Sequence, residues 1–324
     1  VVVRSDAQQQ YIDSILVLMK EHPQEDTIRL GYLNDLAFYY YQSDPREGLK
    51  VADQAIALAM KLGHQAKLAS AYSNKGVNYY AEGEDSLALS MYGKALQVYA
   101  GIRNRSGMAR TYNNMAMIYA ERSDYPQALD TYGKALEELK RYGDSANVAS
   151  LYSNLGVVYL RMADYPKALD YYLHALGMYE KLTSQVSMAN TLSNIGIVYK
   201  SMANFPLALQ YHERALKIYE AAGNLQGKAN CLANMGVVYD EMNHPQQSLP
   251  LYRQALAINE KIGNNRRIAS DLTNIALVYK AQHDYPRAMP FLLKALHLYE
   301  QTEDKNSMAT VLDEIGHIYS QAPA

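Results

Sequence analysis

Residues 149–188 read ASLYSNLGVVYLRMADYPKALDYYLHALGMYEKLTSQVSM, and the same pattern returns every forty residues along the chain. One tyrosine marks this period without any insertion or deletion, at Tyr39, Tyr79, Tyr119, Tyr159, Tyr199, Tyr239, Tyr279 and Tyr319. Strict self-similarity at a period of about 20–50 residues is the signature of a solenoid, in which each repeat buries its apolar face against its neighbours. The sequence therefore predicts a repeat architecture rather than separate globular domains.

Each repeat contains the signals of two helices. In the first half of the quoted stretch, Leu151, Leu155 and Val158 follow helical spacing. A turn follows around Asp164 and Pro166, where the acidic side chain can cap a helix whose first turn tolerates proline. The second half again carries one apolar stripe. We call the two predicted elements the first and second helix of a repeat.

A column of small residues in the middle of the first helices predicts a close contact between helices. Its members are Gly76, Ala116, Gly156, Gly196, Gly236, Ala276 and Gly316. A glycine inside a helix costs about 0.5–1 kcal/mol relative to alanine, so its recurrence needs a reason. We expect that reason to be close approach of the second helix, where the facing column is Ala88, Ala128, Ala168, Ala208 and Ala288.

These columns resemble the tetratricopeptide repeat. The family pattern of aromatic, Leu-Gly, Tyr, Ala, aromatic and Ala is matched by Tyr152, Leu155-Gly156, Tyr159, Ala168, Tyr172 and Ala175. The period is 40 rather than the usual 34 residues, and Glu180 stands where the family has a late proline. Forty-residue versions resemble kinesin light chains, cell-polarity adaptors, peptide-pheromone receptors of bacteria and the repeat regions of Bacteroidetes-type signalling proteins.

The resemblance implies an all-α solenoid, a right-handed superhelix of about eight antiparallel helix pairs that forms one domain over residues 1–324. We expect a capping helix within 8–28, seven repeats over 29–308, and the first helix of a truncated or capping eighth repeat at 309–324. The first residue is not methionine and the second helix of an eighth repeat is missing. We therefore expect that the natural protein is longer.

The resemblance also implies a binding groove lined by the first helices. An asparagine recurs there, at Asn34, Asn74, Asn114, Asn154, Asn194, Asn234 and Asn274, and in peptide-binding relatives it bonds the ligand backbone. A carboxamide both donates and accepts, whereas asparagine is otherwise a mediocre helix former. The alternative is a structural hydrogen bond to a neighbouring helix. Val157, Ile197 and Val237 would form an apolar groove floor, and Asn190 and Asn230 would belong to its polar edge.

Composition and motifs exclude several other classes of function. The net charge of −2 lacks the basic excess of a nucleic-acid binder, and no run is apolar for long enough to span a membrane. The eight histidines are scattered, with no metal-binding motif and no phosphate loop, so we expect no cofactor, no metal and no enzyme activity. Cys231, the one cysteine, leaves the cellular compartment unidentified.

The sequence thus predicts a scaffold that binds a protein or peptide segment in its groove, as the input region of a larger signalling protein. Two alternatives stay open. One is self-association, as a homodimer or filament through the terminal helix. The other is a small-ligand sensor domain of a histidine kinase or nucleotide cyclase.

Overall fold

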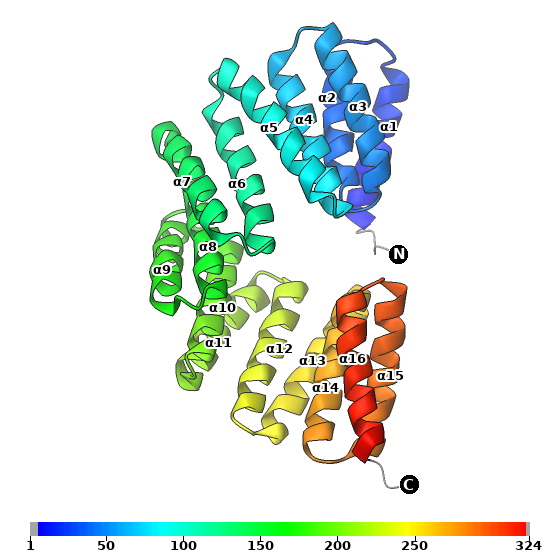
Figure 1. Ribbon diagram of the computed structural model, residues 1–324, viewed down its shortest axis with the longest axis vertical. Coiled ribbons are helices and arrows are strands. Elements are labelled where there is room, and N and C mark those ends of the chain that lie inside the picture. The colour runs from blue at the N-terminus through cyan, green and yellow to red at the C-terminus, as the bar shows by residue number, and fades with distance from the viewer. Residues whose placement is uncertain (1–5, 322–324) are drawn as a thin grey trace. The chain divides into compact units, whose positions relative to one another are not determined.

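The computed structural model describes residues 6–321, and within that range the chain forms sixteen helices and no strand (Figure 1). Within residues 6–161 and within residues 165–321, consecutive helices pack against one another in the order in which the chain runs. This arrangement confirms the predicted all-α solenoid of stacked helix pairs. No helix between residues 6 and 321 is long and apolar enough to cross a membrane.

The contacts divide the described residues into two compact units, whose boundary in the sequence lies between Asp164 and Tyr165. The N-terminal unit contains α1 (Asp6–Glu21), α2 (Thr27–Tyr40), α3 (Pro45–Lys61), α4 (Gln65–Ala81), α5 (Asp85–Gly101), α6 (Arg105–Glu121), α7 (Tyr125–Tyr142) and α8 (Ser145–Arg161). The C-terminal unit contains α9 (Tyr165–Lys181), α10 (Gln185–Ser201), α11 (Phe205–Ala221), α12 (Leu225–Glu241), α13 (Pro245–Ile262), α14 (Asn265–Ala281), α15 (Tyr285–Gln301) and α16 (Lys305–Gln321). The prediction of one continuous domain stays a prediction.

From α4 onward each first helix begins four residues before the predicted frame, and at most of these starts a polar side chain caps the helix. The Asp144 carboxylate accepts a hydrogen bond from the backbone N–H of Asn147 at 3.0 Å, and Asn224 caps α12 in the same way. These residues satisfy backbone donors that a helix start leaves unpaired. The last helix therefore begins at Lys305 rather than at 309, and its predicted residues 322–324 lie outside the described range.

The small column of the first helices faces aromatic rings rather than alanines. A Cβ atom added at Gly76 would lie 2.7 Å from the ring of Tyr92, and one at Gly236 would lie 2.6 Å from the ring of Tyr252. Both rings come from the second helix of the same repeat and are almost fully buried. The close approach was predicted correctly, but the expected partner was wrong, because the ring fills the space that the missing methyl group leaves.

The first described helix, α1, is held to α2 by an arginine. Arg29 of α2 donates from Nη1 to the carbonyl oxygens of Met19, in the last turn of α1, and of His22, just after that helix. Inside the predicted segment 8–28, the helix ends at Glu21 and residues 22–26 form the connection. Ile12 and Ile15 of α1 are buried. This helix therefore covers one side of the first full pair.

We predict that Gly236→Ala lowers the free energy of unfolding by about 1–3 kcal/mol, because the new methyl group collides with the Tyr252 ring. Combining it with Tyr252→Leu copies the Ala276 and Leu292 pair of the next repeat and should restore much of the loss. Gly177→Ala is the control, since nothing lies within 4 Å of its added Cβ, and it should stabilise by about 0.5–1 kcal/mol. Urea denaturation measures all three, and unchanged stability of Gly236→Ala would contradict the account.

Candidate functional site

The asparagine column lies in the middle of the first helices, on the side where one first helix meets the next. In the N-terminal unit α4 lies against α2, α6 against α4 and α8 against α6, and in the C-terminal unit α12 lies against α10. Asn34 is buried, and the other six asparagines are half-buried. Their carboxamides are therefore positioned between structural neighbours and solvent.

Three of these asparagines donate to the preceding first helix. Asn74 donates from Nδ2 to the backbone oxygen of Asn34 at 2.8 Å. Asn154 donates to Oδ1 of Asn113 at 2.8 Å, and Asn234 donates to Oγ of Ser193 at 3.4 Å. At these three positions the asparagine forms a hydrogen bond between consecutive first helices. This is the structural role that the sequence analysis gave as the alternative to ligand binding.

The other asparagines differ because their neighbours differ. Asn34 belongs to the first helix α2, and its Nδ2 turns back to the Leu30 oxygen of its own helix. Asn154 and Asn234 each donate to a residue 41 positions earlier, Asn113 or Ser193. The residue 41 positions before Asn274 is Ala233, whose side chain accepts no hydrogen bond. Within residues 6–321 the Asn274 carboxamide makes no hydrogen bond that the structure records. Asn194 likewise makes no hydrogen bond that the structure records, and Asn114 accepts one from Asn113 at 3.5 Å.

The predicted floor and edge residues also occupy defined places. Val157, Ile197 and Val237 are half-buried on the first helices, so each keeps part of its apolar surface exposed. On the predicted edge, Asn190 accepts a hydrogen bond from the Tyr219 hydroxyl, and Asn230 accepts one from Gln226 at 3.2 Å. These two edge side chains are thus already engaged within the chain.

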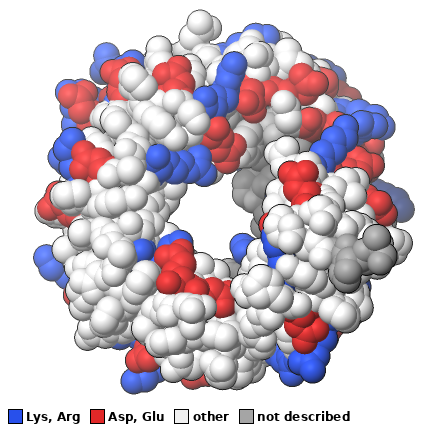
Figure 2. Space-filling model, turned by 60° about the horizontal axis from the view of Figure 1, so that its bottom comes forward, with Lys and Arg blue, Asp and Glu red and all other residues white. Residues whose placement is uncertain are grey.

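Charged groups of the first helices pair across repeats. Lys200 and Glu241 form an ion pair at 2.9 Å, and Lys280 pairs with Glu314. The Tyr80 hydroxyl donates to the Glu121 carboxylate at 2.6 Å. Figure 2 shows Lys and Arg side chains interspersed with Asp and Glu side chains over the face that it draws.

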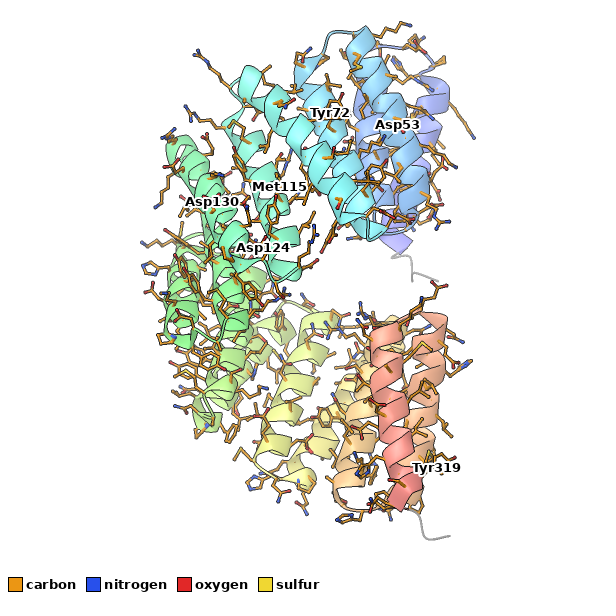
Figure 3. The ribbon with its side chains drawn as sticks, viewed as in Figure 1. Asp53, Tyr72, Met115, Asp124, Asp130 and Tyr319 are labelled. Atoms are coloured by element: carbon orange, nitrogen blue, oxygen red, sulfur yellow. The ribbon has the colours of Figure 1, made fainter. Side chains whose placement is uncertain are left out.

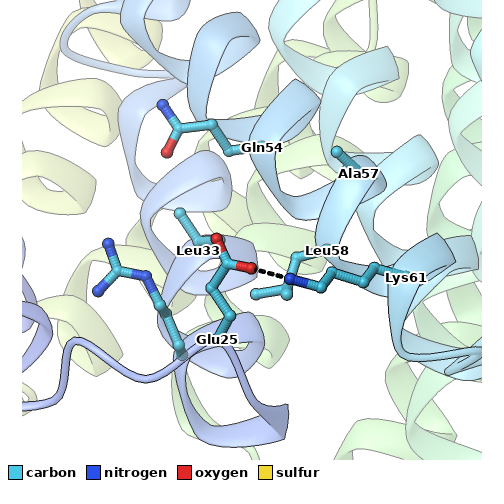
Figure 4. A pocket seen from close by; sticks show the side chains of 7 residues that line it. Glu25, Leu33, Gln54, Ala57, Leu58 and Lys61 are labelled. Atoms are coloured by element: carbon cyan, nitrogen blue, oxygen red, sulfur yellow. Dashed lines mark hydrogen bonds and ion pairs between the residues drawn. The ribbon is translucent and has the colours of Figure 1, made fainter.

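Two cavities that sequence reasoning missed lie beside these helices. One, of about 310 Å³, is lined by Glu25, Arg29, Leu33, Leu58 and Lys61, and two of these lining residues, Glu25 and Lys61, form an ion pair at 2.5 Å (Figure 4). The other, of about 260 Å³, opens between the ends of α12, α13 and α14, and its lining includes Asp240 and Leu277. Cavities form where loops and helix ends meet, which a repeat pattern does not specify.

Buried polar groups stand where the repeat pattern changes. Asp271 is the one charged residue in a column that otherwise holds Gly, Ala, Thr, Leu, Cys and Val, and Asn259 replaces the tyrosine of Tyr219. Both are buried, and Asn259 Nδ2 donates to Asp271 Oδ2 at 2.6 Å. Burial raises the pKa of the Asp271 carboxyl to about 6, although the bond from Asn259 and the charge of Arg267 oppose the rise. The signal was present in the sequence, as a pair of departures from two columns.

A second polar cluster surrounds His212, which replaces the tyrosine of its column. Its Nδ1 lies 3.4 Å from Ser193 Oγ, and its ring lies against Gly196. Burial lowers the pKa of the imidazole to about 4 and raises the pKa of the neighbouring Cys231 thiol to about 11. The imidazole is therefore neutral and the thiol protonated at neutral pH. Among residues 6–321 no three His, Cys, Asp or Glu side chains come together in a way that could hold a metal ion.

Comparison with family models identifies the repeat. A model described as tetratricopeptide repeat matches residues 107–181 and 187–261, and a second model of that description matches 269–307. A model described as soluble NSF attachment protein matches residues 5–141. None of the curated proteins compared with the chain is a match.

Several solved structures share the fold. BtubC (BKLC) from P. vanneervenii is 26% identical with a TM-score of 0.55, and the match covers 67% of this chain and 90% of that chain. A Rap protein complexed with Competence and Sporulation Factor is 13% identical with a TM-score of 0.64, covering 98% and 93%. Aspartyl phosphate phosphatase F from Bacillus subtilis is 15% identical with a TM-score of 0.63, covering 99% and 85%. The last two, at under 25% identity, show the fold alone.

We predict that Asp271 makes folding stability fall as pH rises. Because the pKa of Asp271 is higher in the folded chain than in the unfolded chain, its contribution is complete below about pH 4 and is lost as pH rises through about 6. The stability difference between the wild type and Asp271→Asn should therefore shift by about 1–3 kcal/mol over this range. Chemical denaturation of both proteins at several pH values measures this stability difference. His212 titrates in both proteins, so its opposing effect on stability cancels in the difference. A difference that does not change with pH would contradict the assignment.

Proposed function

Because the chain belongs to the tetratricopeptide repeat proteins, we propose that it is a binding scaffold that holds an extended, uncharged segment of a protein or peptide along its first helices. We place it as the input region of a larger signalling protein. We propose no enzyme activity and no nucleic-acid binding for it. The Asn274 carboxamide, which the preceding helix does not engage, is the observation that carries this proposal.

The chemistry around Asn274 suits a peptide backbone. Its carboxamide can donate to a peptide oxygen and accept from a peptide N–H at the same time. Val237 and Leu277 stand three residues after Asn234 and Asn274, so one helical turn separates the polar column from the partly exposed apolar one. A ligand that is neutral along its backbone and apolar in its side chains matches both columns.

The charge pattern favours a neutral ligand. The pairs Lys200–Glu241 and Lys280–Glu314 satisfy these charges within the protein. A strongly acidic segment would need several free lysines or arginines that converge on it. The bonds from Asn154 and Asn234 and these ion pairs also hold the first helices in place before a ligand arrives. A preformed surface reduces the ordering that binding requires.

The comparisons support binding of a partner in this fold. The Rap protein of the same fold was solved in complex with Competence and Sporulation Factor, over a match that covers 98% of this chain. Two buried groups of a kind that often acts in catalysis are poorly suited to it here. The protonated Cys231 thiol is a poor nucleophile, and the buried His212 imidazole is a weak base.

A second candidate function, self-association through the terminal helix, is favoured by the exposure of α16. Leu312 and Tyr319 on this helix are 50% and 66% exposed, whereas Leu272 and Tyr279 of the preceding repeat are 1% and 6% exposed. Large apolar side chains exposed together mark a contact surface.

We predict that Asn274→Ala weakens ligand binding without changing stability. The probe is a peptide selected from a phage-displayed library of random dodecapeptides on the immobilised chain, with its affinity measured by fluorescence anisotropy. Loss of the hydrogen bonds from one carboxamide should weaken binding by about tenfold. Asn147→Ala, a change at an exposed asparagine of α8, is the matched control and should bind as the wild type does. If no peptide is selected, or if Asn274→Ala binds it unchanged, the proposed function is wrong.

Asn234→Ala should behave differently from Asn274→Ala. It removes the bond to Ser193 that joins α12 to α10, so we expect the free energy of unfolding to fall by about 0.5–1.5 kcal/mol. Thermal denaturation of both variants makes the comparison. Equal stability of the two variants would show that the hydrogen bond to the preceding helix contributes nothing measurable.

A further inference from the structure

One cavity of the C-terminal unit lies at the end of the predicted groove. It has a volume of about 260 Å³ and opens between the last turns of α12 and α14 and the first turn of α13. Figure 3 draws the side chains of these helices, whose ribbons run from yellow to orange. Leu277 lines the cavity and also stands one helical turn after Asn274, in the apolar column. The cavity therefore shares a wall with the surface on which the proposed ligand lies.

The lining of the cavity combines apolar surface with acceptor oxygens. Leu277 and Val278 of α14 supply apolar surface, and Asp240 of α12 supplies a carboxylate. The carboxamides of Asn243 and Gln282 add two further side-chain oxygens. Such a lining suits a side chain that has an apolar stem and a polar, hydrogen-bond-donating head, as lysine and arginine do.

Two other repeats show what normally meets a residue at the place of Asp240. Tyr80 and Lys200 hold that place in earlier first helices. The Tyr80 hydroxyl donates to the Glu121 carboxylate at 2.6 Å, and Lys200 pairs with Glu241 at 2.9 Å. In both repeats the partner stands 41 positions later, on the next first helix.

Asp240 has no such partner. The residue 41 positions later is Ala281, which cannot form an ion pair. Lys280, one residue before it, is paired with Glu314 instead. Among residues 6–321 no lysine, arginine or histidine side chain pairs with the Asp240 carboxylate in the structure. This half-buried group therefore brings a negative charge to the cavity that no cation of the protein compensates.

A buried tyrosine holds the carboxylate in place. The Tyr252 hydroxyl donates to Oδ2 of Asp240 at 2.6 Å, and the Tyr252 ring is almost fully buried. Burial raises the pKa of the Asp240 carboxyl, although hydrogen bonds from Ser248 and Tyr252 oppose the rise. A carboxylate can accept at about four sites, so these two bonds leave room for a cation.

The helix ends around the cavity add to its negative charge. α12 and α14 meet it with their C-terminal ends, where the backbone carbonyl groups carry partial negative charge. α13 meets it with its N-terminus, which carries partial positive charge of similar size. One of the two C-terminal ends offsets this N-terminus, so the second one and the Asp240 carboxylate both favour a positively charged occupant.

We propose that this cavity binds a basic side chain of the ligand, with the charged head against Asp240 and the methylene stem along Leu277 and Val278. The inference rests on the proposed function and adds one charge to the ligand that it describes. The segment is uncharged beside Asn274 and carries one lysine or arginine close to that point. Asn243 can accept a further hydrogen bond from the same head group.

The distance along α14 sets where the basic residue stands in the ligand. Ala281 follows Asn274 by seven residues, which corresponds to about 10 Å along the axis of a helix. An extended chain covers about 3.3 Å per residue. The basic residue should therefore lie within about three positions of the peptide unit that Asn274 holds.

The first test repeats the selection of dodecapeptides on Asp240→Asn. This change removes the charge and keeps an oxygen that accepts the Tyr252 hydroxyl, and thermal denaturation confirms that the variant is folded. Peptides selected on the wild type should share a lysine or arginine at a fixed position, and those selected on the variant should lack it. A wild-type-selected peptide should bind Asp240→Asn about tenfold more weakly, as measured by fluorescence anisotropy.

A double-mutant cycle assigns this loss to one contact. The basic residue of the peptide is replaced by a neutral residue of similar length, norleucine for lysine or citrulline for arginine. The peptide change and Asp240→Asn together should weaken binding no more than either change alone. Asp170→Asn is the matched control, because it removes one negative charge from an exposed position of α9 in the same unit, and it should bind as the wild type does.

The second test needs no selected peptide. The probe is n-butylamine, which corresponds to the side chain of lysine, and n-butanol is its neutral control. Both are titrated at pH 8, above the range in which histidines gain charge, while the side-chain amide signals of Asn243 and Gln282 are followed by nuclear magnetic resonance. The amine should shift these signals and saturate in the millimolar range, as suits so small a ligand. The alcohol should not, and Asp240→Asn should abolish the effect of the amine.

The outcomes separate this inference from the proposed function. The inference is wrong if Asp240→Asn binds the selected peptide as tightly as the wild type does, or if butylamine and butanol shift the two amides alike. Asn274→Ala tests the groove independently, so weaker peptide binding by that variant leaves the proposed function standing in either case. If no peptide is selected while butylamine binds and Asp240→Asn abolishes its binding, the groove function fails and the amine site remains.

Discussion

A close contact between a small residue of a first helix and a ring of the following second helix, found in three of the repeats, sets the spacing on which the rest of the structure depends. Gly76 with Tyr92, Gly196 with His212 and Gly236 with Tyr252 place an aromatic or imidazole ring where a Cβ atom would otherwise lie. The helices of a pair can then approach closely, and each pair presents its next face to the following first helix. Because the contact repeats every forty residues, a stack of similar pairs results.

That spacing brings the first helices side by side, and it decides which side chains are used internally. Asn154 and Asn234 find an acceptor on the preceding helix, whereas Asn274 stands opposite the place of Ala233. The same column therefore supports the structure at some repeats and offers free hydrogen-bonding groups at another. A binding function is compatible with stability because the two uses fall on different members of one column.

The period of the sequence is sufficient to predict the helix pairs, the solenoid and the close approach at the small column. It could not predict the bonds of the asparagines, because each depends on a residue about 41 positions earlier on another helix. Gly48 shows the same limit. It replaces the alanine of its column because the buried Asn78 carboxamide would lie 1.9 Å from an added Cβ. The buried pair Asp271 and Asn259 was likewise visible only as two separate departures from the pattern. The peptide-binding role of the column stays a prediction.

The central claim is that a partner segment binds along the first helices and engages the Asn274 carboxamide. Side-chain amide resonances of asparagine, followed by nuclear magnetic resonance during titration with the selected peptide, test it most directly. The account predicts that the Asn274 signals shift and saturate with the peptide while those of Asn147 stay in place. Shifts confined to residues of the second helices, with the Asn274 signals unchanged, would contradict it.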